Sequence, residues 1–210
     1  PQLTRRGRRP RVGINASRAT IILRITAEGA NEHQALDAME PTAGLIYEKL
    51  GSLIFGEGDD RLQDAVARLL KKKDKTLATA EWGTGGLVAD WLGELEPAGG
   101  VYHGGVVVRS SHALSEVLGV SPAVLQRHSA GSAEATGAMA AGCRAKFGAD
   151  YGLAVGRFPL PGPGAAAHFA LATPEGVRAH AHPYANHPEL LRVFCAKIAL
   201  NLVRLELLAR

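Results

Sequence analysis

The stretch with the clearest chemical potential is TLATAEWGTGGLVADWL, from Thr76 to Leu92. A β-rich run leads into a Gly-Thr-Gly-Gly turn, and an amphipathic segment typical of a helix follows it. A strand, turn and helix joined in this way aim backbone N–H groups and the positive end of the helix dipole at an anion. The turn therefore supplies four candidate ligand-binding residues for a phosphate: Gly83, Thr84, Gly85 and Gly86.

A second cluster follows the apolar run GGVVV, where the sequence continues Arg109-Ser110-Ser111-His112. Arg109 supplies a cation that can pair with a phosphate, and Ser110 and Ser111 are further ligand-binding candidates. A serine next to His112 also suggests a nucleophile with its base. Such a pair is defined by its spatial geometry, which adjacent residues rarely satisfy, so this alternative stays open.

The histidines of the segment HAHPYANH suggest a metal site. His180 and His182 fall on one face of an expected strand, and His187 follows, with Glu189 as the nearest carboxylate. Imidazoles are common zinc ligands, but a solvated strand face gives the same pattern. We therefore expect no metal and no cofactor.

Hydrophobic periodicity places these residues on alternating strands and helices. The expected strands span 76–82, 101–108 and 151–156, followed by a hairpin of HFALAT and VRAHAH around PEG. The expected helices span 87–95, a short segment near Leu114, a segment entered at Ser121-Pro122, 132–148 and 189–209. This order predicts a three-layer α/β/α domain with a mixed sheet.

A smaller α+β unit precedes this domain. The segment TIILRITA (20–27) alternates as a strand does, and Asn31 followed by Gln34 resembles a capping box at the start of a helix. Pro41 is expected to break or restart that helix before it ends near Leu50. A short extended piece, SLIFGEG, should follow. Asp59 or Asp60 is expected to cap the next helix.

Positive charge is concentrated at the N-terminus. Of the 24 lysines and arginines, five arginines lie within the first eleven residues, and the other 19 face 20 acidic residues. Such a segment is usually a flexible arm, so nucleic acid is not the expected partner, although a contact by these arginines is the alternative. The expected parts are a basic flexible tail at 1–11, a small α+β domain at 12–58 and an α/β domain at 59–210.

Composition favours a globular protein of the cytoplasm. No apolar run approaches the roughly 18 residues that a membrane span needs, so no membrane partner is expected. Cys143 and Cys195 lie far apart in helix-like segments, which predicts two buried thiols rather than a disulfide. Sheet edges must be covered somewhere, so a homo-oligomer such as a dimer is expected.

The order of motifs from Leu62 to the C-terminus resembles the C-terminal domain of the competence/damage-inducible protein family, CinA. LATAEWGTGGLVADWL matches an ATAESCTGG-type motif, GGVVVRSSHALSEVLGV matches a GGVVTYSNEAKxxLLGV-type motif, and GADYGLAV precedes a Gly/Pro-rich loop. LRITAEGANEHQALDAMEP with GEGDD is similar to the small KH-like domain that precedes it in longer members. The resemblance thus implies a KH-like fold for the N-terminal unit.

Characterised members of that family are nicotinamide mononucleotide deamidases. The resemblance implies hydrolysis of the carboxamide of nicotinamide mononucleotide (NMN) to nicotinic acid mononucleotide and ammonia, without a metal. In the family, a Ser of the ESCTGG motif is understood to be the nucleophile, and a Tyr and a Lys of the TYSNEAK motif handle the proton. An NMN-like small molecule is therefore the ligand that the resemblance implies.

All three catalytic positions of the family are substituted in this sequence. The serine position is Trp82, whose indole N–H only donates, and the tyrosine position is Arg109, which stays protonated. The lysine position is Leu114, which has no ionisable group. We therefore expect a degenerate, non-catalytic member that binds a ligand or acts as a scaffold. An active NMN deamidase that uses substitute residues is the alternative.

Two interpretations of the glycine-rich turn follow. Gly85 and Gly86 either hold a phosphate, or they only permit a tight turn while Trp82 fills the former pocket as core. An open cleft near Thr84, Arg109 and Ser110 would favour a ligand, whereas a filled pocket would favour a scaffold. The loop GRFPLPGPG also departs from the family's TGIAGPGG-type sequence.

Overall fold

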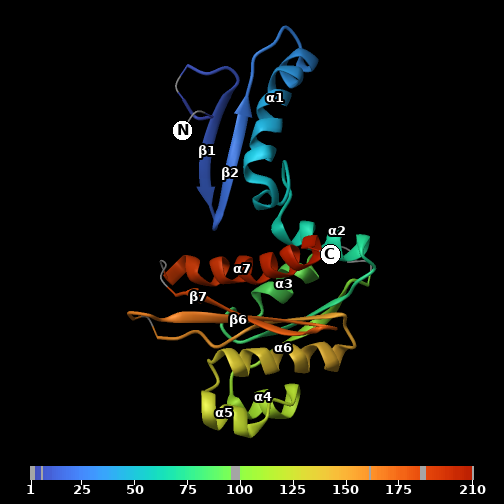
Figure 1. Ribbon diagram of the computed structural model, residues 1–210, viewed down its shortest axis with the longest axis vertical. Coiled ribbons are helices and arrows are strands. Elements are labelled where there is room, and N and C mark those ends of the chain that lie inside the picture. The colour runs from blue at the N-terminus through green and yellow to red at the C-terminus, as the bar shows by residue number, and fades with distance from the viewer. Residues whose placement is uncertain (1–2, 6, 96–99, 161, 185–187, 210) are drawn as a thin grey trace. The chain divides into compact units, whose positions relative to one another are not determined.

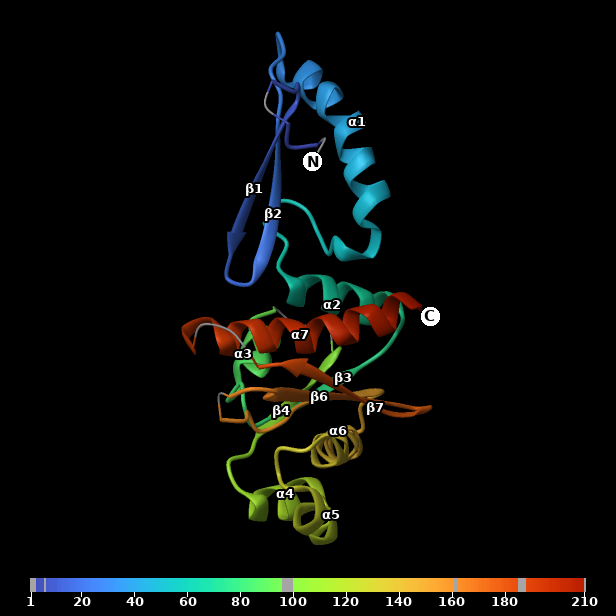
Figure 2. The same cartoon turned by 60° about the vertical axis from the view of Figure 1, so that its left-hand side comes forward.

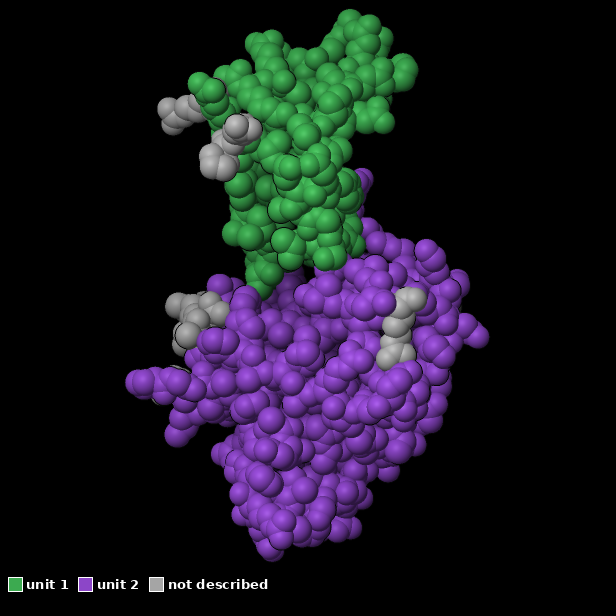
Figure 3. Space-filling view, in the orientation of Figure 1, with its two compact units in different colours: residues 1–56 green, residues 57–210 purple. Residues whose placement is uncertain are grey.

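The computed structural model describes residues 3–5, 7–95, 100–160, 162–184 and 188–209. The chain divides into two compact units, Pro1–Gly56 and Glu57–Arg210 (Figure 3). Sequence patterns placed the corresponding boundary between residues 58 and 59. Within the described ranges, the helices are too short or too polar to cross a lipid bilayer.

The N-terminal unit is a β-hairpin with one long helix (Figure 1). β1 (Arg11–Ser17) and β2 (Thr20–Thr26) pair antiparallel along their whole length. α1 (Glu32–Leu50) begins where the Asn31 side chain accepts a hydrogen bond from the backbone N–H three residues later, as the capping pattern predicts. A 3-10 turn, η1 (Gly51–Leu53), ends the unit.

Three expectations for this unit were wrong. Pro41 lies inside an unbroken α1, because proline removes only one N–H donor and the residues on both sides keep their helical hydrogen bonds. The extended piece after α1 starts instead as the η1 turn. The basic segment is not a separate tail, since β1 starts at Arg11 and Arg8 Nη2 donates to Thr42 Oγ1 of α1 at 3.0 Å.

The C-terminal unit is built on a five-stranded sheet with the order β4-β3-β5-β6-β7. β3 runs parallel to both of its neighbours, β4 and β5, whereas β6 pairs antiparallel with β5 and with β7. The predicted mixed sheet and its late hairpin are therefore confirmed. The strands are β3 (Leu77–Glu81), β4 (Tyr102–Val107), β5 (Tyr151–Val155), β6 (Ala166–Thr173) and β7 (Gly176–Pro183).

Helices cover both faces of this sheet, which confirms the three-layer architecture (Figures 1 and 2). α2, α3 and α7 lie on one face and α6 lies on the other, with α4 and α5 packed against the outer side of α6. α2 starts after Arg61 rather than at an aspartate cap, and Asp60 instead pairs with Arg68. The helices are α2 (Leu62–Lys72), α3 (Leu87–Gly93), α4 (Ser111–Leu118), α5 (Pro122–His128), α6 (Ala133–Phe147) and α7 (Pro188–Ala209).

Both cysteines are free and buried, as the sequence predicts. Burial raises the pKa of Cys143 to about 12 and that of Cys195 to about 11. A thiol must lose its proton to become a nucleophile or a metal ligand. The two cysteines are therefore packing residues.

The connections after β3 and β4 leave the sheet on opposite faces. β3 leads through α3 to β4 on one side, and β4 leads through α4, α5 and α6 to β5 on the other side of β3. Crossovers between parallel strands are right-handed. Because β4 and β5 lie on opposite sides of β3, the two crossovers pass over opposite faces of the sheet. Ligands of α/β sheets bind at the carboxyl ends of such neighbouring strands. The loops that begin at Trp82 and Val108 meet there.

Asp150 joins the opposite, amino ends of β3 and β5. Its carboxylate accepts hydrogen bonds from the Thr76 N–H at 3.0 Å, from the Thr76 hydroxyl at 2.9 Å and from Lys75 Nζ at 3.2 Å. Burial alone would raise the pKa of Asp150, but the hydrogen bonds from Thr76 and Lys75 outweigh it and hold the pKa below its ordinary value.

We expect Asp150→Ala to lower the free energy of unfolding by about 2 kcal/mol at neutral pH, because half-buried donors on Thr76 lose a charged acceptor. A lowered folded-state pKa means that this contribution is fully present above the unfolded-state pKa and is lost as the pH falls through the folded-state pKa. Urea denaturation at neutral and acidic pH, followed by tryptophan fluorescence, measures it. A difference between wild type and variant that does not shrink in acid would contradict this assignment.

Candidate functional site

Glu81, the last residue of β3, holds the loop that follows it. Its side chain is 1% exposed, and Oε2 accepts from the Thr84 hydroxyl at 2.5 Å and from the N–H groups of Gly86 and Val88 at 3.1 Å each. Oε1 accepts from the Ala89 N–H at 2.8 Å. These amides belong to the start of α3, so the Glu81 carboxylate caps that helix from inside the protein.

The predicted phosphate cradle is therefore largely occupied by the protein itself. The Gly86 N–H is bound to Glu81, and the Gly83 N–H donates to Gly156 O at 3.1 Å. Gly85 and Gly86 adopt φ values of +62° and +97°, which a residue with a side chain would rarely accept. These glycines shape a tight strand-to-helix turn, and Thr84, which precedes them, is buried.

Trp82 is half-buried at the carboxyl end of β3. Its backbone N–H donates to Val155 O at 2.9 Å, and its indole packs against the apolar core between the sheet and α6. The guanidinium carbon of Arg157 lies 5.6 Å from the centre of the indole, which is a cation–π distance. The indole therefore lies between the core on one side and the Arg157 cation on the other.

Phe158, in the loop after β5, covers Gly83. A Cβ built on Gly83 would lie 2.3 Å from the Phe158 ring, so a side chain at this position would displace the ring. The Phe158 ring also contacts Tyr184, with 5.1 Å between ring centres. Burial raises the pKa of Tyr184, so its phenol gives up its proton less readily than a free tyrosine. The space beside Gly83 is filled by an aromatic pair.

Three arginines from separate elements surround this loop. Arg109 Nη1 donates to the Trp82 carbonyl at 3.4 Å. Arg192 of α7 donates to the Thr84 carbonyl from Nε at 3.1 Å and from Nη2 at 2.7 Å. In the described ranges, Arg109, Arg157 and Arg192 form no ion pair with a carboxylate. The rim of the loop therefore keeps a net positive charge.

The remaining predicted residues lie at the start of α4. The Ser110 hydroxyl accepts from the Ala113 N–H at 3.1 Å and so caps this helix, while Ser111 and His112 are exposed. Leu114 is fully buried in the core that also receives Trp82. Ser110 thus has a structural role at the position where sequence alone suggested a nucleophile.

The histidine pattern of the late hairpin does not form a metal centre in the part of the chain that the structure describes. The His182 ring lies edge-on to Phe194, with 5.3 Å between ring centres. His187 and the side chain of Glu189 lie outside the described residues. Across the described ranges, no three histidine, cysteine or acidic residues are grouped closely enough to hold a metal ion.

Two family models match the chain. The CinA C-terminal domain covers residues 59–207, and the damage-inducible protein CinA KH domain covers residues 2–56. The chain belongs to the CinA family. Both parts of the resemblance predicted from the motifs are thereby confirmed, and the KH match includes the basic N-terminal segment.

Curated relatives and solved structures agree with this membership. A CinA-like protein of Synechococcus sp. (strain RCC307) is 34% identical over a match that covers 94% of this chain and 49% of the relative. A CinA-like protein of Frankia casuarinae is 33% identical over a match that covers 93% of this chain and 46% of the relative. The chain thus spans about half the length of these relatives.

The structural neighbours are CinA proteins of similar extent to the C-terminal unit. A CinA superfamily protein of Klebsiella pneumoniae 700603 has a TM-score of 0.66 and 27% identity, covering 71% of this chain and 97% of its own. The competence damage-inducible protein A of Klebsiella pneumoniae MGH 78578 has a TM-score of 0.65 and 30% identity, covering 70% and 95%.

Sequence reasoning missed four residues that shape this CinA site. Arg157 and Phe158 follow β5, which ends beside β3. Loops after neighbouring parallel strands gather at one edge of the sheet, so the position of these two residues in GRFPLPGPG could have predicted that they lie near the turn. Glu81 directly precedes the glycine-rich turn, where a carboxylate can reach back to the helix amides. Arg192 lies 108 residues from Thr84, and no local pattern relates the two.

Glu81→Ala should destabilise the C-terminal unit by about 3 kcal/mol or more, since three backbone amides and a hydroxyl lose a charged acceptor. Urea denaturation followed by the fluorescence of Trp82 and Trp91, both in this unit, measures the loss. Glu116→Ala, at an exposed position on α4, is the matched control and should change stability by less than about 0.5 kcal/mol. Equal stability of the two variants would refute the capping role.

Gly83→Ala should cost about 1–3 kcal/mol in the wild-type background, because its methyl group would overlap the Phe158 ring. In a Phe158→Ala background the same change should cost much less. A double-mutant cycle measured by urea denaturation gives the coupling energy between the two positions. The packing of Phe158 on Gly83 is contradicted if the cost of the added methyl is the same in both backgrounds.

Proposed function

We propose that this CinA-family chain does not hydrolyse an amide and that its C-terminal unit binds an anionic, mononucleotide-like molecule at the arginine rim. The observation that carries the first part is the packing of the Trp82 indole against the core at the position of the family's nucleophile. An indole has no lone pair available for attack on a carbonyl, and here it is also covered by Arg157.

The two positions that handle the proton in the family support the same proposal. The Arg109 guanidinium has only N–H donors, one of which donates to the Trp82 carbonyl, so it is not a base. Leu114 is fully buried and brings no ionisable group to the loop. A lysine at that place could act as a base only through a pKa lowered by its surroundings, and leucine offers nothing equivalent.

The neighbouring hydroxyls give no evident substitute nucleophile. Thr84 is buried, and its hydroxyl donates to Glu81 at 2.5 Å. Ser110 Oγ accepts the capping hydrogen bond of α4. Loss of a nucleophile and its base together typically lowers the rate by about 10⁶, leaving only binding and oxyanion effects. These observations favour a non-catalytic member over an active deamidase with relocated residues.

The anionic ligand is supported by charge and by topology. Arg109, Arg157 and Arg192 are exposed side chains at the carboxyl ends of β3, β4 and β5, where ligands of α/β sheets bind. Guanidinium groups pair well with phosphates, and the contacts of Arg109 and Arg192 with single carbonyl oxygens leave other N–H donors on each group. A mononucleotide offers the phosphate that such a rim would recognise.

The deciding experiment incubates the purified chain, expressed in a host without its own deamidase, with NMN and measures ammonia and nicotinic acid mononucleotide. A CinA protein that retains the Ser, Tyr and Lys residues is the positive control. We expect no product above the buffer blank. Turnover that disappears in Arg109→Gln or Ser110→Ala would overturn the proposal and reveal a rebuilt active site.

Binding is tested separately by calorimetric titration with NMN and with nicotinic acid mononucleotide. The double variant Arg109→Gln/Arg192→Gln should raise the dissociation constant at least about fivefold, because charge-assisted hydrogen bonds are lost. Arg127→Gln/Lys146→Gln, at exposed positions of α5 and α6 in the same unit, removes the same two charges and is the matched control. An equal effect of both variants would argue against a site at the rim.

A further inference from the structure

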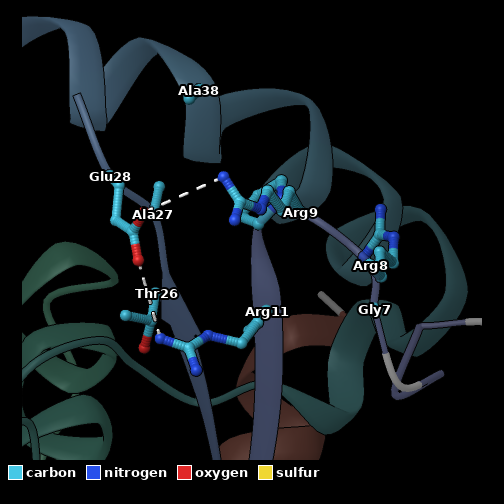
Figure 4. A pocket seen from close by; sticks show the side chains of 9 residues that line it. Gly7, Arg8, Arg9, Arg11, Thr26, Ala27, Glu28 and Ala38 are labelled. Carbon is cyan, nitrogen blue, oxygen red and sulfur yellow. Dashed lines mark ion pairs between the residues drawn. The ribbon is translucent and has the colours of Figure 1, made fainter.

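The N-terminal unit contains a cavity of about 500 Å³ that has no role in the site described above. It lies between the start of β1, the end of β2 and α1, and it is lined by three arginines, one glutamate and small residues (Figure 4). Pockets of roughly 300–1,000 Å³ hold small molecules of nucleotide size. The arginines are Arg8, Arg9 and Arg11.

Charge in this cavity is unbalanced. Glu28 is the single acidic residue of the lining, and Arg9 and Arg11 reach it from different sides with N–O distances of 3.9 Å each (Figure 4). All three of these side chains are more than two thirds exposed. Exposed pairs at this distance contribute little energy, so both guanidinium groups can exchange Glu28 for a better acceptor.

Arg8 adds a third charge with no acidic partner in the described ranges. Its Nη2 donates to Thr42 Oγ1 at 3.0 Å, which fixes the side chain, while its Nη1 is buried and has no acceptor among the described residues. Figure 4 shows the Arg8 side chain pointing away from Glu28. A buried donor without an acceptor is rare in folded proteins and calls for an acceptor such as a water molecule or an anion.

We propose that this cavity binds a phosphate group, carried either by a free nucleotide or by single-stranded nucleic acid. Three guanidinium groups against one carboxylate leave two positive charges, which a phosphate ester neutralises. Arginine binds phosphate oxygens through two parallel hydrogen bonds, a geometry that lysine does not provide. The cavity is larger than a phosphate, so the rest of the ligand also has room.

The most informative variant is a substitution of Glu28, because the proposal predicts that it strengthens binding. Its carboxylate competes with the phosphate for Arg9 and Arg11, so Glu28→Gln should tighten binding by about threefold or more, whereas a merely destabilising change would weaken it. Arg9→Gln/Arg11→Gln should weaken binding at least about tenfold. Arg18→Gln/Arg24→Gln removes the same charge from exposed hairpin residues outside the cavity and should have a much smaller effect.

The experiment titrates the full chain and its variants, at low salt, with pyrophosphate, with a mononucleotide and with a fluorescent single-stranded oligonucleotide. Circular dichroism melts show that each variant is folded. Binding of the mononucleotide and pyrophosphate identifies a free phosphate ester as the source. Binding of the oligonucleotide alone, with affinity that falls steeply with salt, identifies nucleic acid.

Three results would overturn the proposal: no binding of any probe by the wild-type chain, equal weakening by the two double variants, or weaker binding by Glu28→Gln. Equal weakening would mean that only the overall charge of the unit attracts the probe. The variants at Arg109 and Arg192 belong to the other unit, so the outcome at this cavity is independent of the outcome at the arginine rim.

Discussion

The C-terminal unit depends on one buried carboxylate. Glu81 accepts four hydrogen bonds from the next eight residues and thereby joins the end of β3 to the start of α3 through a turn of fixed shape. A buried charge is tolerated only when its oxygens are fully hydrogen-bonded, and the helix amides provide that. The carbonyls of Trp82 and Thr84 are fixed by the same turn, and Arg109 and Arg192 bind them there.

The hydrogen bonds of Glu81 fix the shape of the turn independently of the side chains that lie beside it. Because Glu81 already occupies amides at the start of α3, the shape of the turn does not depend on the side chain at position 82. The neighbouring side chains also fit one another: the lack of a Cβ at Gly83 makes room for Phe158, and Arg157 beside it covers Trp82. Several neighbouring positions therefore contribute to filling this place in the fold.

Local patterns predicted the elements of the C-terminal unit well, because each strand is bounded by a clear turn and α4, α5 and α6 each begin at a serine cap, such as Ser132 before α6. They failed at Pro41, which suggested a helix break although α1 continues through it. They also failed where a distant contact decides. Within the site, the sequence placed Arg109 next to the turn, but the contact of Arg192 with Thr84 depends on how α7 crosses the sheet, which no short pattern records.

In the N-terminal unit, the linear sequence was likewise not enough to predict where the charged side chains lie. Residues 3–30 contain seven arginines and one acidic residue, whereas α1 contains four acidic residues and one lysine. As a linear run, the arginines resemble a solvated tail. Once β1 begins at Arg11 and Arg8 is bound to α1, three of them line one cavity with a single carboxylate. Repulsion among these arginines opposes folding, and a bound anion would relieve it. The excess of positive charge around this cavity therefore says more about a ligand than the net charge of the whole chain does.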